Sequence, residues 1–147
     1  MLSAITLHET SGHDEGLRMA LQAGDLPVDD IEDEGRTFFR AVSDAGQTVG
    51  YAGIEQCGGD LLLRSVVVLP EHRSRGLGRA IVEAALQKAS RSSDVFLATT
   101  SAARFFANFG FSEVPRTVVP AAVLATRQLS SICPSSATIM KLIKPPS

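Results

Sequence analysis

The stretch of this sequence with the clearest potential for chemistry is residues 66–79, VVVLPEHRSRGLGR. An apolar run ends at Pro70, a short basic loop follows, and Gly76 and Gly78 open a predicted helix. The N-terminus of a helix offers unpaired N–H groups and a partial positive charge, which suit an anion. Glycine lets the backbone approach phosphate oxygens that a Cβ would block. This pattern predicts a binding site for a phosphate-containing ligand.

Three arginines add positive charge at the same end of this helix, namely Arg73, Arg75 and Arg79. A cation there is unfavourable by about 0.3–1 kcal/mol, so three of them need a reason, and a bound polyanion supplies one. Two other phosphate loops are excluded. The sequence contains neither the P-loop pattern G-x-x-x-x-G-K-S/T nor the dinucleotide pattern G-x-G-x-x-G after its first predicted strand.

The elements that must position this loop predict an α/β fold in a single domain, residues 1–147. Hydrophobic periodicity and turn residues predict strands at residues 2–7, 37–42, 48–55, 61–69, 95–100 and 137–143. They predict helices at residues 11–23, 76–90, 102–109 and 120–126, the first opened by a capping box of Ser11 and Asp14. Residues 28–34 are acidic and form either a second short helix or a loop.

Composition excludes several classes of protein. Apolar residues make up 44% and charged residues 20%, as in an average globular domain, and no run approaches the roughly 18 apolar residues of a membrane helix. The N-terminal residues lack the pattern of a secretory signal. The two cysteines, Cys57 and Cys133, are too few for a disulfide scaffold and lack metal-ligand spacing. We therefore expect a cytoplasmic protein without a metal site.

Charge is distributed unevenly along the chain. Residues 1–70 carry 12 acidic and 4 basic residues, a balance of −8, whereas residues 71–147 carry 4 acidic and 10 basic residues, a balance of +6. The asymmetry indicates either an anionic ligand held mainly by the second half or chance segregation of surface charge. Nucleic acid is not expected as a partner, because the basic residues are dispersed and aromatic residues make up only 5%.

Two motifs resemble one known family. The pattern Arg73-x-x-Gly76-x-Gly78 after a central strand resembles the acetyl-CoA pyrophosphate loop of the GNAT superfamily of N-acetyltransferases. Residues 99–111 resemble the superfamily's second signature, A-x-x-F-Y-x-x-x-G-F. The resemblance spans nearly the whole chain. It implies a mixed central sheet of six to seven strands that splays between strands 4 and 5, about four flanking helices, and a homodimer formed through the C-terminal strands.

The resemblance also implies a site for acetyl-CoA as cosubstrate. The backbone of Val66, Val67 and Val68 corresponds to the groups that hold the pantetheine arm. The other implied cofactor-binding residues are Arg73, Ser74, Arg75, Gly76, Leu77, Gly78 and Arg79 around the pyrophosphate, together with Ser101, Phe105 and Phe106. In the family, the neutral amine of a small-molecule substrate attacks the thioester directly. The enzyme orients the reactants, polarises the carbonyl, deprotonates the amine and protonates the departing thiolate.

The sequence departs from the family pattern at two positions. Many members have a tyrosine that protonates the thiolate, and this chain has Phe106 there, which cannot donate a proton. Tyr51, the only tyrosine, belongs to another part of the sequence. Thr99 replaces an asparagine often found at the start of the second signature. Either water or another group donates the proton, or catalysis is weak.

Three polar residues on the central strands are candidates for the remaining chemistry. Glu55 is either the catalytic base, acting through water, or a solvated hairpin residue. Ser65 is a second candidate catalytic residue. Arg64 interrupts a buried strand on the same expected face as Val66 and Val68, and a buried arginine requires an anion. That anion is either a substrate carboxylate or an internal acid such as Glu55.

A narrower resemblance covers residues 95–142. They resemble the C-terminal half of bacterial N-acetylglutamate synthase domains and, more closely, small N-acetyltransferases associated with arsenic resistance, whose C-P-x-S-A pattern is here residues 133–137. In the glutamate enzymes an arginine and a serine hold the substrate carboxylate. Ser136 matches that serine, but Pro134 stands at the arginine position, and Glu55 stands where those enzymes have a lysine. This favours an amino-acid-like amine other than glutamate, with Arg64, Thr99 and Ser136 as substrate-binding residues.

Three functions remain open from the sequence. The first is acetyl transfer to a small amino-acid-like amine, in detoxification of arsenic compounds or toxic amino acids. The second is an acyl-CoA sensor with little turnover, which the phenylalanine at position 106 supports. The third is acetylation of a protein or peptide recruited by an acidic groove, for which the candidates are Asp29, Asp30, Glu32, Asp33 and Glu34.

Overall fold

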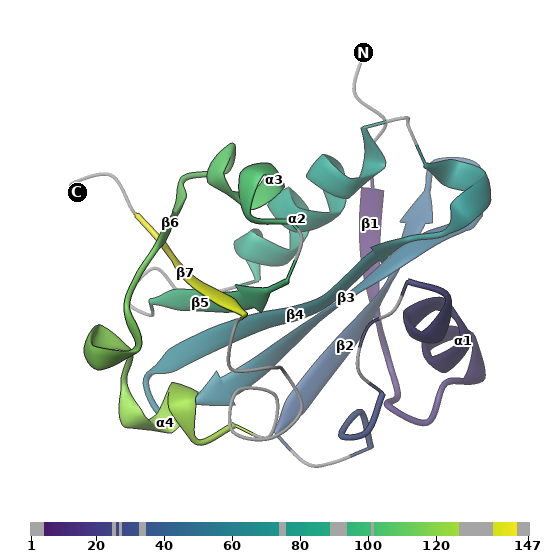
Figure 1. Cartoon of the computed structure of the whole chain (residues 1–147). Helices are drawn as coiled ribbons and strands as arrows, with labels where there is room; N and C mark the ends of the chain where they lie inside the picture. Colours follow the sequence, from purple (N-terminus) through teal and green to yellow (C-terminus); the bar gives the residue numbers. More distant parts are fainter. Residues whose placement is uncertain are drawn as a thin grey trace. The chain divides into compact units, whose positions relative to one another are not determined.

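Within the residues that the structure describes, seven strands form a mixed sheet in the order β1-β2-β3-β4-β5-β7-β6 (Figure 1). The structure is a computed structural model that describes residues 5–24, 26, 28–32, 35–73, 76–88, 94–100, 102–126 and 137–143. The chain divides into two compact units, one of residues 1–55 and 63–90 and one of residues 56–62 and 91–147. The mixed α/β sheet of the sequence analysis is confirmed. That residues 1–147 form a single domain stays a prediction.

The first unit contains most of four strands and two helices. In chain order these are β1 (Ile5–Thr10), α1 (Glu15–Ala23), β2 (Arg36–Ser43), β3 (Thr48–Cys57), β4 (Asp60–Val68), the 3-10 turn η1 (Pro70–His72) and α2 (Leu77–Gln87). β2 is antiparallel to both β1 and β3, and its register sets Phe38 opposite Gly53 and Arg36 opposite Glu55. The predicted hairpin of β2 and β3 is confirmed.

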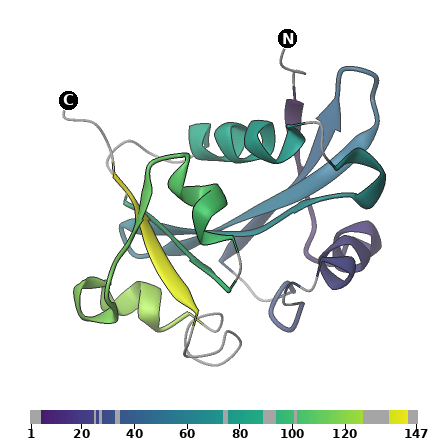
Figure 2. The same cartoon turned by 45° about the horizontal axis from the view of Figure 1, so that its top comes forward.

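Helices α1 and α2 cover opposite faces of this part of the sheet (Figure 2). Successive residues of a strand face opposite sides, and on β3 Tyr51 faces α1 while Gly50 faces α2. A Cβ on Gly16 of α1 would lie 2.7 Å from the Tyr51 hydroxyl oxygen. A Cβ on Gly50 would lie 2.8 Å from Cδ1 of Ile81 on α2 and would overlap the carbonyl oxygen of Val67. Glycine at position 50 therefore allows α2 and β4 to pack closely on β3.

The core beneath α1 is built by the helical face that the sequence predicted. Leu17, Ala20 and Leu21 are all buried, and they pack in one cluster with Ile31, Phe38, Tyr51 and Val67. Burying a leucine side chain stabilises the fold by about 1.5–3 kcal/mol. This cluster fixes α1 against the strands that carry the polar residues described below.

Strand β4 is irregular at Ser65, whose φ of 59° is the only positive value among the described residues other than glycine. A left-handed conformation costs an L-residue about 1–2 kcal/mol, and it also breaks the regular alternation of side chains. Arg64 and Val67 consequently lie on the same face, because the Arg64 guanidinium lies over a phenylalanine ring of the cluster that contains Val67. The expectation that Arg64 shares a face with Val66 and Val68 is wrong, since it assumed a regular strand.

The second unit contains the C-terminal elements. They are β5 (Val95–Thr99), α3 (Ala103–Ala107), β6 (Phe111–Glu113), the 3-10 turn η2 (Arg116–Val118), α4 (Ala121–Leu124) and β7 (Thr138–Leu142). β5 pairs in parallel with the first residues of β4 at Leu61 and Leu62, and β7 lies antiparallel between β5 and β6. β4 thus begins in this unit, paired with β5, and continues in the first unit.

The helix boundaries differ from those predicted at the N-terminal end. α1 begins at Glu15 with Asp14 as its N-cap, because the Asp14 carboxylate accepts a hydrogen bond from the Gly16 N–H at 2.8 Å. The Ser11 hydroxyl instead accepts from the His13 N–H, so the predicted capping box is wrong. Residues 29–32 form turns, which is the loop alternative of the two predicted for this region. In the part of the chain that the structure describes, no helix is long and apolar enough to cross a membrane.

Candidate functional site

The N-terminus of α2 is an open end of a helix, as the glycines predicted. Its N-cap, Gly76, has a φ of 73°, in the left-handed region that favours glycine, and no atom of the described residues lies within 4 Å of where a Cβ would be. Among the residues that the structure describes, no side chain caps this end, and the first turn of α2 contains no acidic residue. The N–H groups of Leu77, Gly78 and Arg79 are therefore placed to bind an anion. The Arg79 side chain is exposed and pairs with Glu83 at 3.0 Å.

A hydrogen bond connects the turn before α2 to the end of β4. Arg73 is exposed, and its Nε donates a hydrogen bond to the Val68 carbonyl oxygen at 3.2 Å. His72 is half-buried, and its Nδ1 is the one buried side-chain nitrogen or oxygen in the described part of the chain without a hydrogen-bond partner. An unsatisfied buried polar atom calls for a missing partner such as a ligand. Both features fit a polar ligand between β4 and the start of α2.

Several predicted site residues lie outside the described residues. These are Ser74, Arg75, Ser101 and Ser136, together with Cys133. Their assignments stay predictions from the motifs.

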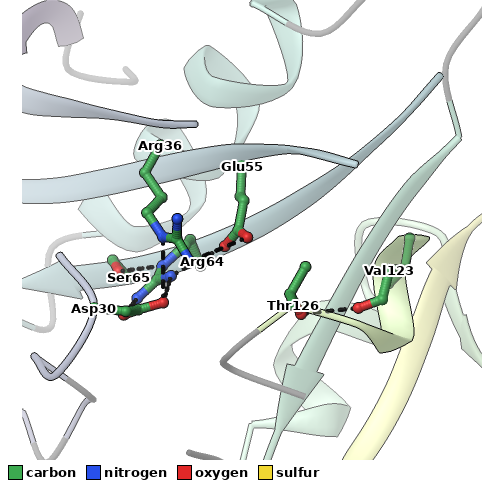
Figure 3. A network of polar contacts seen from close by, with 7 residues as sticks. All are labelled: Asp30, Arg36, Glu55, Arg64, Ser65, Val123 and Thr126. Atoms are coloured by element: carbon green, nitrogen blue, oxygen red, sulfur yellow. Dashed lines mark hydrogen bonds and ion pairs between the residues drawn. The ribbon is translucent and has the colours of Figure 1, made fainter. Parts of the chain in front are cut away.

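The most extensive polar contacts of the first unit surround Arg64 (Figure 3). Its Nη1 and Nη2 donate to the two carboxylate oxygens of Asp30, both at 2.6 Å, which is a bidentate ion pair. Nη1 also donates to Glu55 at 3.2 Å, and Nε donates to the Ser65 hydroxyl at 3.2 Å. Arg36 completes the network, with Nε 3.3 Å from Asp30 and Nη2 3.4 Å from Glu55. We call Asp30, Arg36, Glu55 and Arg64 the buried ion network.

The network is balanced in charge and removed from solvent. The side chains of Arg64 and Asp30 are 1% and 0% exposed. Burial alone would raise the pKa of Asp30, but the hydrogen bonds and charge of Arg64, together with Arg36, hold that pKa below its ordinary value of 3.8. Burial likewise lowers the pKa of Arg64, whereas Asp30 and Glu55 raise it above its ordinary value. Both groups are charged at neutral pH, as a buried ion pair requires.

This arrangement bears on two predicted site residues. The anions that the structure places against Arg64 are the internal carboxylates of Asp30 and Glu55, which favours the internal alternative over a substrate carboxylate. Glu55 is not a solvated hairpin residue, since its side chain is 7% exposed and it pairs with both arginines. Those pairings favour a role in the network over a role as catalytic base. Ser65 is buried and its hydroxyl serves Arg64.

Asp30 is the residue of this network that sequence reasoning misplaced. As one of five candidates for an exposed acidic groove it is misplaced, because its side chain is fully buried. Glu32 of the same run pairs with Arg18 at 2.7 Å and with His13 at 3.2 Å. The signal that could have located Asp30 is its neighbour Ile31, 1% exposed in the core, because an isoleucine amid acids indicates a buried turn.

The second signature lies in the second unit. Thr99 ends β5, and its Oγ1 accepts a hydrogen bond from the Ala102 N–H at 2.9 Å, where α3 begins. Phe106 is buried and makes edge-on ring contacts with Phe105 and Phe111, with centroids 5.1 and 5.9 Å apart. Phe105 itself is 37% exposed. The ring at position 106 therefore belongs to the core.

Among the side chains that the structure describes, no three histidine, cysteine or acidic residues gather as a metal site would require. Cys57 is buried in the cluster with Leu62, Phe96 and Val123.

One comparison with known proteins rests on the sequence. A family model, the acetyltransferase (GNAT) domain, matches residues 34–113, which is more than half of the chain. The match includes β2 to β6 and therefore both the buried ion network's strands and the α2 loop. No curated protein matches the sequence.

A second comparison rests on the fold. The chain is similar to N-acetylglutamate synthase from Neisseria gonorrhoeae complexed with coenzyme A and L-arginine, with a TM-score of 0.72 and 16% identity over 96% of this chain and 33% of that one. It is similar to Rv2747 from Mycobacterium tuberculosis in complex with CoA, with a TM-score of 0.69 and 20% identity over 95% and 99% of the two chains. It is also similar to an acetyltransferase of the GNAT family from Staphylococcus aureus Mu50, with a TM-score of 0.66 and 18% identity over 95% of this chain and 98% of that one. At these identities the likeness concerns the fold.

Proposed function

Because the chain belongs to the GNAT acetyltransferase family, we propose that it transfers the acetyl group of acetyl-CoA to the amine of a small amino-acid-like substrate. The observation that carries this proposal is the segment from β4 to α2. It combines a helix N-terminus that no described side chain caps, a left-handed Gly76 with no described atom near its Cβ position, and a hydrogen bond from Arg73 to the carbonyl of Val68. Residues of this kind fit the pyrophosphate of CoA.

Each part of the segment has a distinct task in the proposed reaction. When bound, acetyl-CoA supplies a thioester whose carbonyl carbon accepts the substrate nitrogen while the thiolate leaves. The N–H groups at the start of α2 and the side chains of Arg73, Arg75 and Arg79 neutralise the pyrophosphate. The backbone of Val66, Val67 and Val68 orients the pantetheine arm and polarises the carbonyl. Ser74, Ser101, Phe105 and Phe106 stay proposed cofactor contacts.

The substrate class is proposed from the narrower resemblance and from a structural neighbour. N-acetylglutamate synthase from Neisseria gonorrhoeae has been crystallised with coenzyme A and N-acetyl-glutamate, an N-acetylated amino acid. Since Arg64 is occupied within the protein, Thr99 and Ser136 remain as the proposed contacts of a substrate carboxylate. Detoxification of arsenic-containing or otherwise toxic amino acids in the cytoplasm is the proposed role, and a homodimer is the proposed assembly.

The experiment that tests the proposal is CoA-thiol release from acetyl-CoA across a panel of amines. The panel contains amino acids, glutamate analogues, arsenic-containing amino acids, polyamines, aminoglycosides and short basic peptides, and each product is verified by mass spectrometry. We expect thiol release with at least one amino-acid-like amine. Acetylation of peptides alone would contradict the small-molecule proposal.

The second candidate function, an acyl-CoA sensor, rests on one specific observation. Phe106 replaces the tyrosine that donates a proton in many family members, and its ring is committed to the core by contacts with Phe105 and Phe111. Saturable acetyl-CoA binding without thiol release across the whole panel would favour the sensor. The peptide alternative keeps fewer candidates for an acidic groove, since Asp30 is buried and Glu32 pairs with Arg18.

Replacing Phe106 with tyrosine is expected to leave turnover unimpaired. If catalysis proceeds without a protein acid at this position, an added hydroxyl does no harm as long as the ring keeps its edge-on contacts. Steady-state kcat of Phe106→Tyr against wild type measures this. A gain in kcat would identify proton donation to the thiolate as limiting, whereas a loss beyond about tenfold would show that the packing of the ring governs activity.

Replacing Glu55 with glutamine tests the remaining catalytic assignment of this residue. The two ion pairs of Glu55 lead us to expect a lower thermal midpoint and a pH–rate profile of wild-type shape. The measurement is kcat against pH, with the unfolding midpoint determined in the same buffers. Loss of the limb of the profile that reports a base would restore Glu55 as the base.

A further inference from the structure

The backbone of β4 contains a strained residue directly before the proposed cofactor strand. Ser65 has a φ of 59°, a conformation that L-residues rarely adopt, and Val66, Val67 and Val68 follow it. Such strain persists only where the surroundings over-determine it, and it clusters at functional sites. The neighbours of Ser65 should therefore include a group that holds it.

The group that contacts Ser65 is the Arg64 guanidinium, and Asp30 fixes that guanidinium in turn. Nε of Arg64 donates to the Ser65 hydroxyl at 3.2 Å, while Nη1 and Nη2 donate to the two oxygens of Asp30 at 2.6 Å (Figure 3). A planar guanidinium that donates hydrogen bonds from two nitrogens to one carboxylate has little freedom to rotate. Asp30, 34 residues away in sequence, thus determines where Nε points.

The consequence of the left-handed residue is a change in the direction of the chain. It brings Val67 to the same face as Arg64 and leaves Val66 and Val68 half-buried. The N–H and carbonyl groups of the three valines turn with the backbone. A regular strand at position 65 would aim these groups differently.

We propose that Asp30 and Arg64 are positioning residues for acetyl transfer, which hold Ser65 in its left-handed conformation and thereby aim the backbone of Val66, Val67 and Val68. The inference rests on the proposed function, in which this backbone contacts acetyl-CoA. Asp30 acts through Arg64, and Arg64 acts through Ser65. Neither side chain needs to touch a substrate.

The test is a double-mutant cycle that replaces the strained residue by one that needs no support. Glycine adopts a positive φ without steric cost, so Ser65→Gly keeps the conformation available whether or not Arg64 holds it. Asp30→Asn is made in the wild-type and in the Ser65→Gly backgrounds, and kcat is measured per folded molecule. We expect Asp30→Asn to lower kcat about 30-fold in the wild-type background and less than about threefold in the glycine background.

A second readout does not depend on turnover. The amide shifts of residues 66–68 are recorded in protein labelled with 15N-valine, without ligand. We expect Asp30→Asn to move these three resonances in the wild-type background and to leave them in place in the Ser65→Gly background. Arg36→Lys is the matched control, because Arg36 also contacts Asp30, at 3.3 Å, whereas the hydrogen bond to the Ser65 hydroxyl comes from Arg64 (Figure 3). It should lower stability and leave the three resonances unmoved.

The outcomes separate this inference from the proposed function. Absence of turnover in the wild type would contradict the proposed function, and the amide shifts would still decide the inference. If Asp30→Asn has equal effects on the amide shifts in the two backgrounds, and on kcat where the enzyme turns over, the inference is overturned. Asp30 would then be a purely stabilising residue. If Asp30→Asn does not fold, Asp30→Glu takes its place, because the longer side chain cannot preserve both 2.6 Å contacts.

Discussion

Replacing Asp30 with asparagine is expected to lower the free energy of unfolding by about 3–5 kcal/mol, because it leaves the buried charge of Arg64 without its main partner. The Arg64 side chain is 1% exposed, so water cannot take the place of the carboxylate. Since domains of this size are stable by only about 5–15 kcal/mol, the loss should be large in a urea titration followed by circular dichroism.

The adjacent acid provides the matched control for this experiment. Asp29 is exposed, and Asp29→Asn removes the same charge from the same turn. We expect that variant to stay within about 0.5 kcal/mol of the wild type. Equal losses for the two variants would contradict the buried ion network.

The ion pair of Asp30 and Arg64 should make the free energy of unfolding fall as the pH is lowered. The pKa of Asp30 lies below its ordinary value of 3.8, despite burial, because Arg64 and Arg36 favour the carboxylate. A carboxyl group with a lowered pKa stabilises the folded state above its unfolded pKa, and this contribution is lost as pH falls toward the folded pKa. The difference in stability between wild type and Asp30→Asn should therefore be constant at neutral pH and shrink below about pH 4. If the stability difference between wild type and Asp30→Asn grew as the pH was lowered, the pKa of Asp30 would not be lowered in the folded state.

The second large effect concerns the cofactor loop. Replacing Arg73 and Arg75 together with alanine is expected to weaken acetyl-CoA binding about 10- to 100-fold at low salt, a loss of about 1.4–2.7 kcal/mol. The Arg73 side chain donates a hydrogen bond to the carbonyl of Val68, and Arg73 lies in the loop that leads into α2. Arg75 is included because it belongs to the same sequence motif. The loss should diminish as salt is added, because salt screens the phosphate charges.

A variant with the same loss of charge elsewhere controls for long-range electrostatics. Arg18 on α1 and Arg116 on η2 lie outside both motifs, and Arg18→Ala with Arg116→Ala should change acetyl-CoA affinity less than about threefold. Calorimetric titration at two salt concentrations measures both double variants. Unchanged affinity in the Arg73 and Arg75 variant would remove the pyrophosphate assignment.

The features that could be predicted from the sequence depend on local patterns. The spacing of Leu17, Ala20 and Leu21 matches a helical turn and therefore predicts the buried face of α1. Gly76 precedes a helical pattern and therefore predicts the open start of α2. The near-continuous apolar run of β4 likewise indicated a strand buried on both faces.

The features that could not be predicted depend on tertiary contacts. Ser65 carries no local signal for a left-handed conformation, since it is neither glycine nor asparagine, and Arg64 holds it only once Asp30 is in place. Asp30 and Asp29 are indistinguishable as neighbours in an acidic run until the chain folds. Ser11 and Asp14 are both good N-caps, and the geometry of the first turn, where Asp14 meets the Gly16 N–H, chooses between them.

Direct titration of the wild-type protein with acetyl-CoA tests the central claim, that the segment from β4 to α2 holds the cosubstrate of an acetyltransferase. The account predicts saturable binding at one site per chain, with an affinity that falls as salt is added. Competition by CoA and by adenosine 3′,5′-bisphosphate should follow, since both carry phosphates that the loop is expected to bind. Absence of acetyl-CoA binding at millimolar concentration, in protein shown to be folded, would contradict the account.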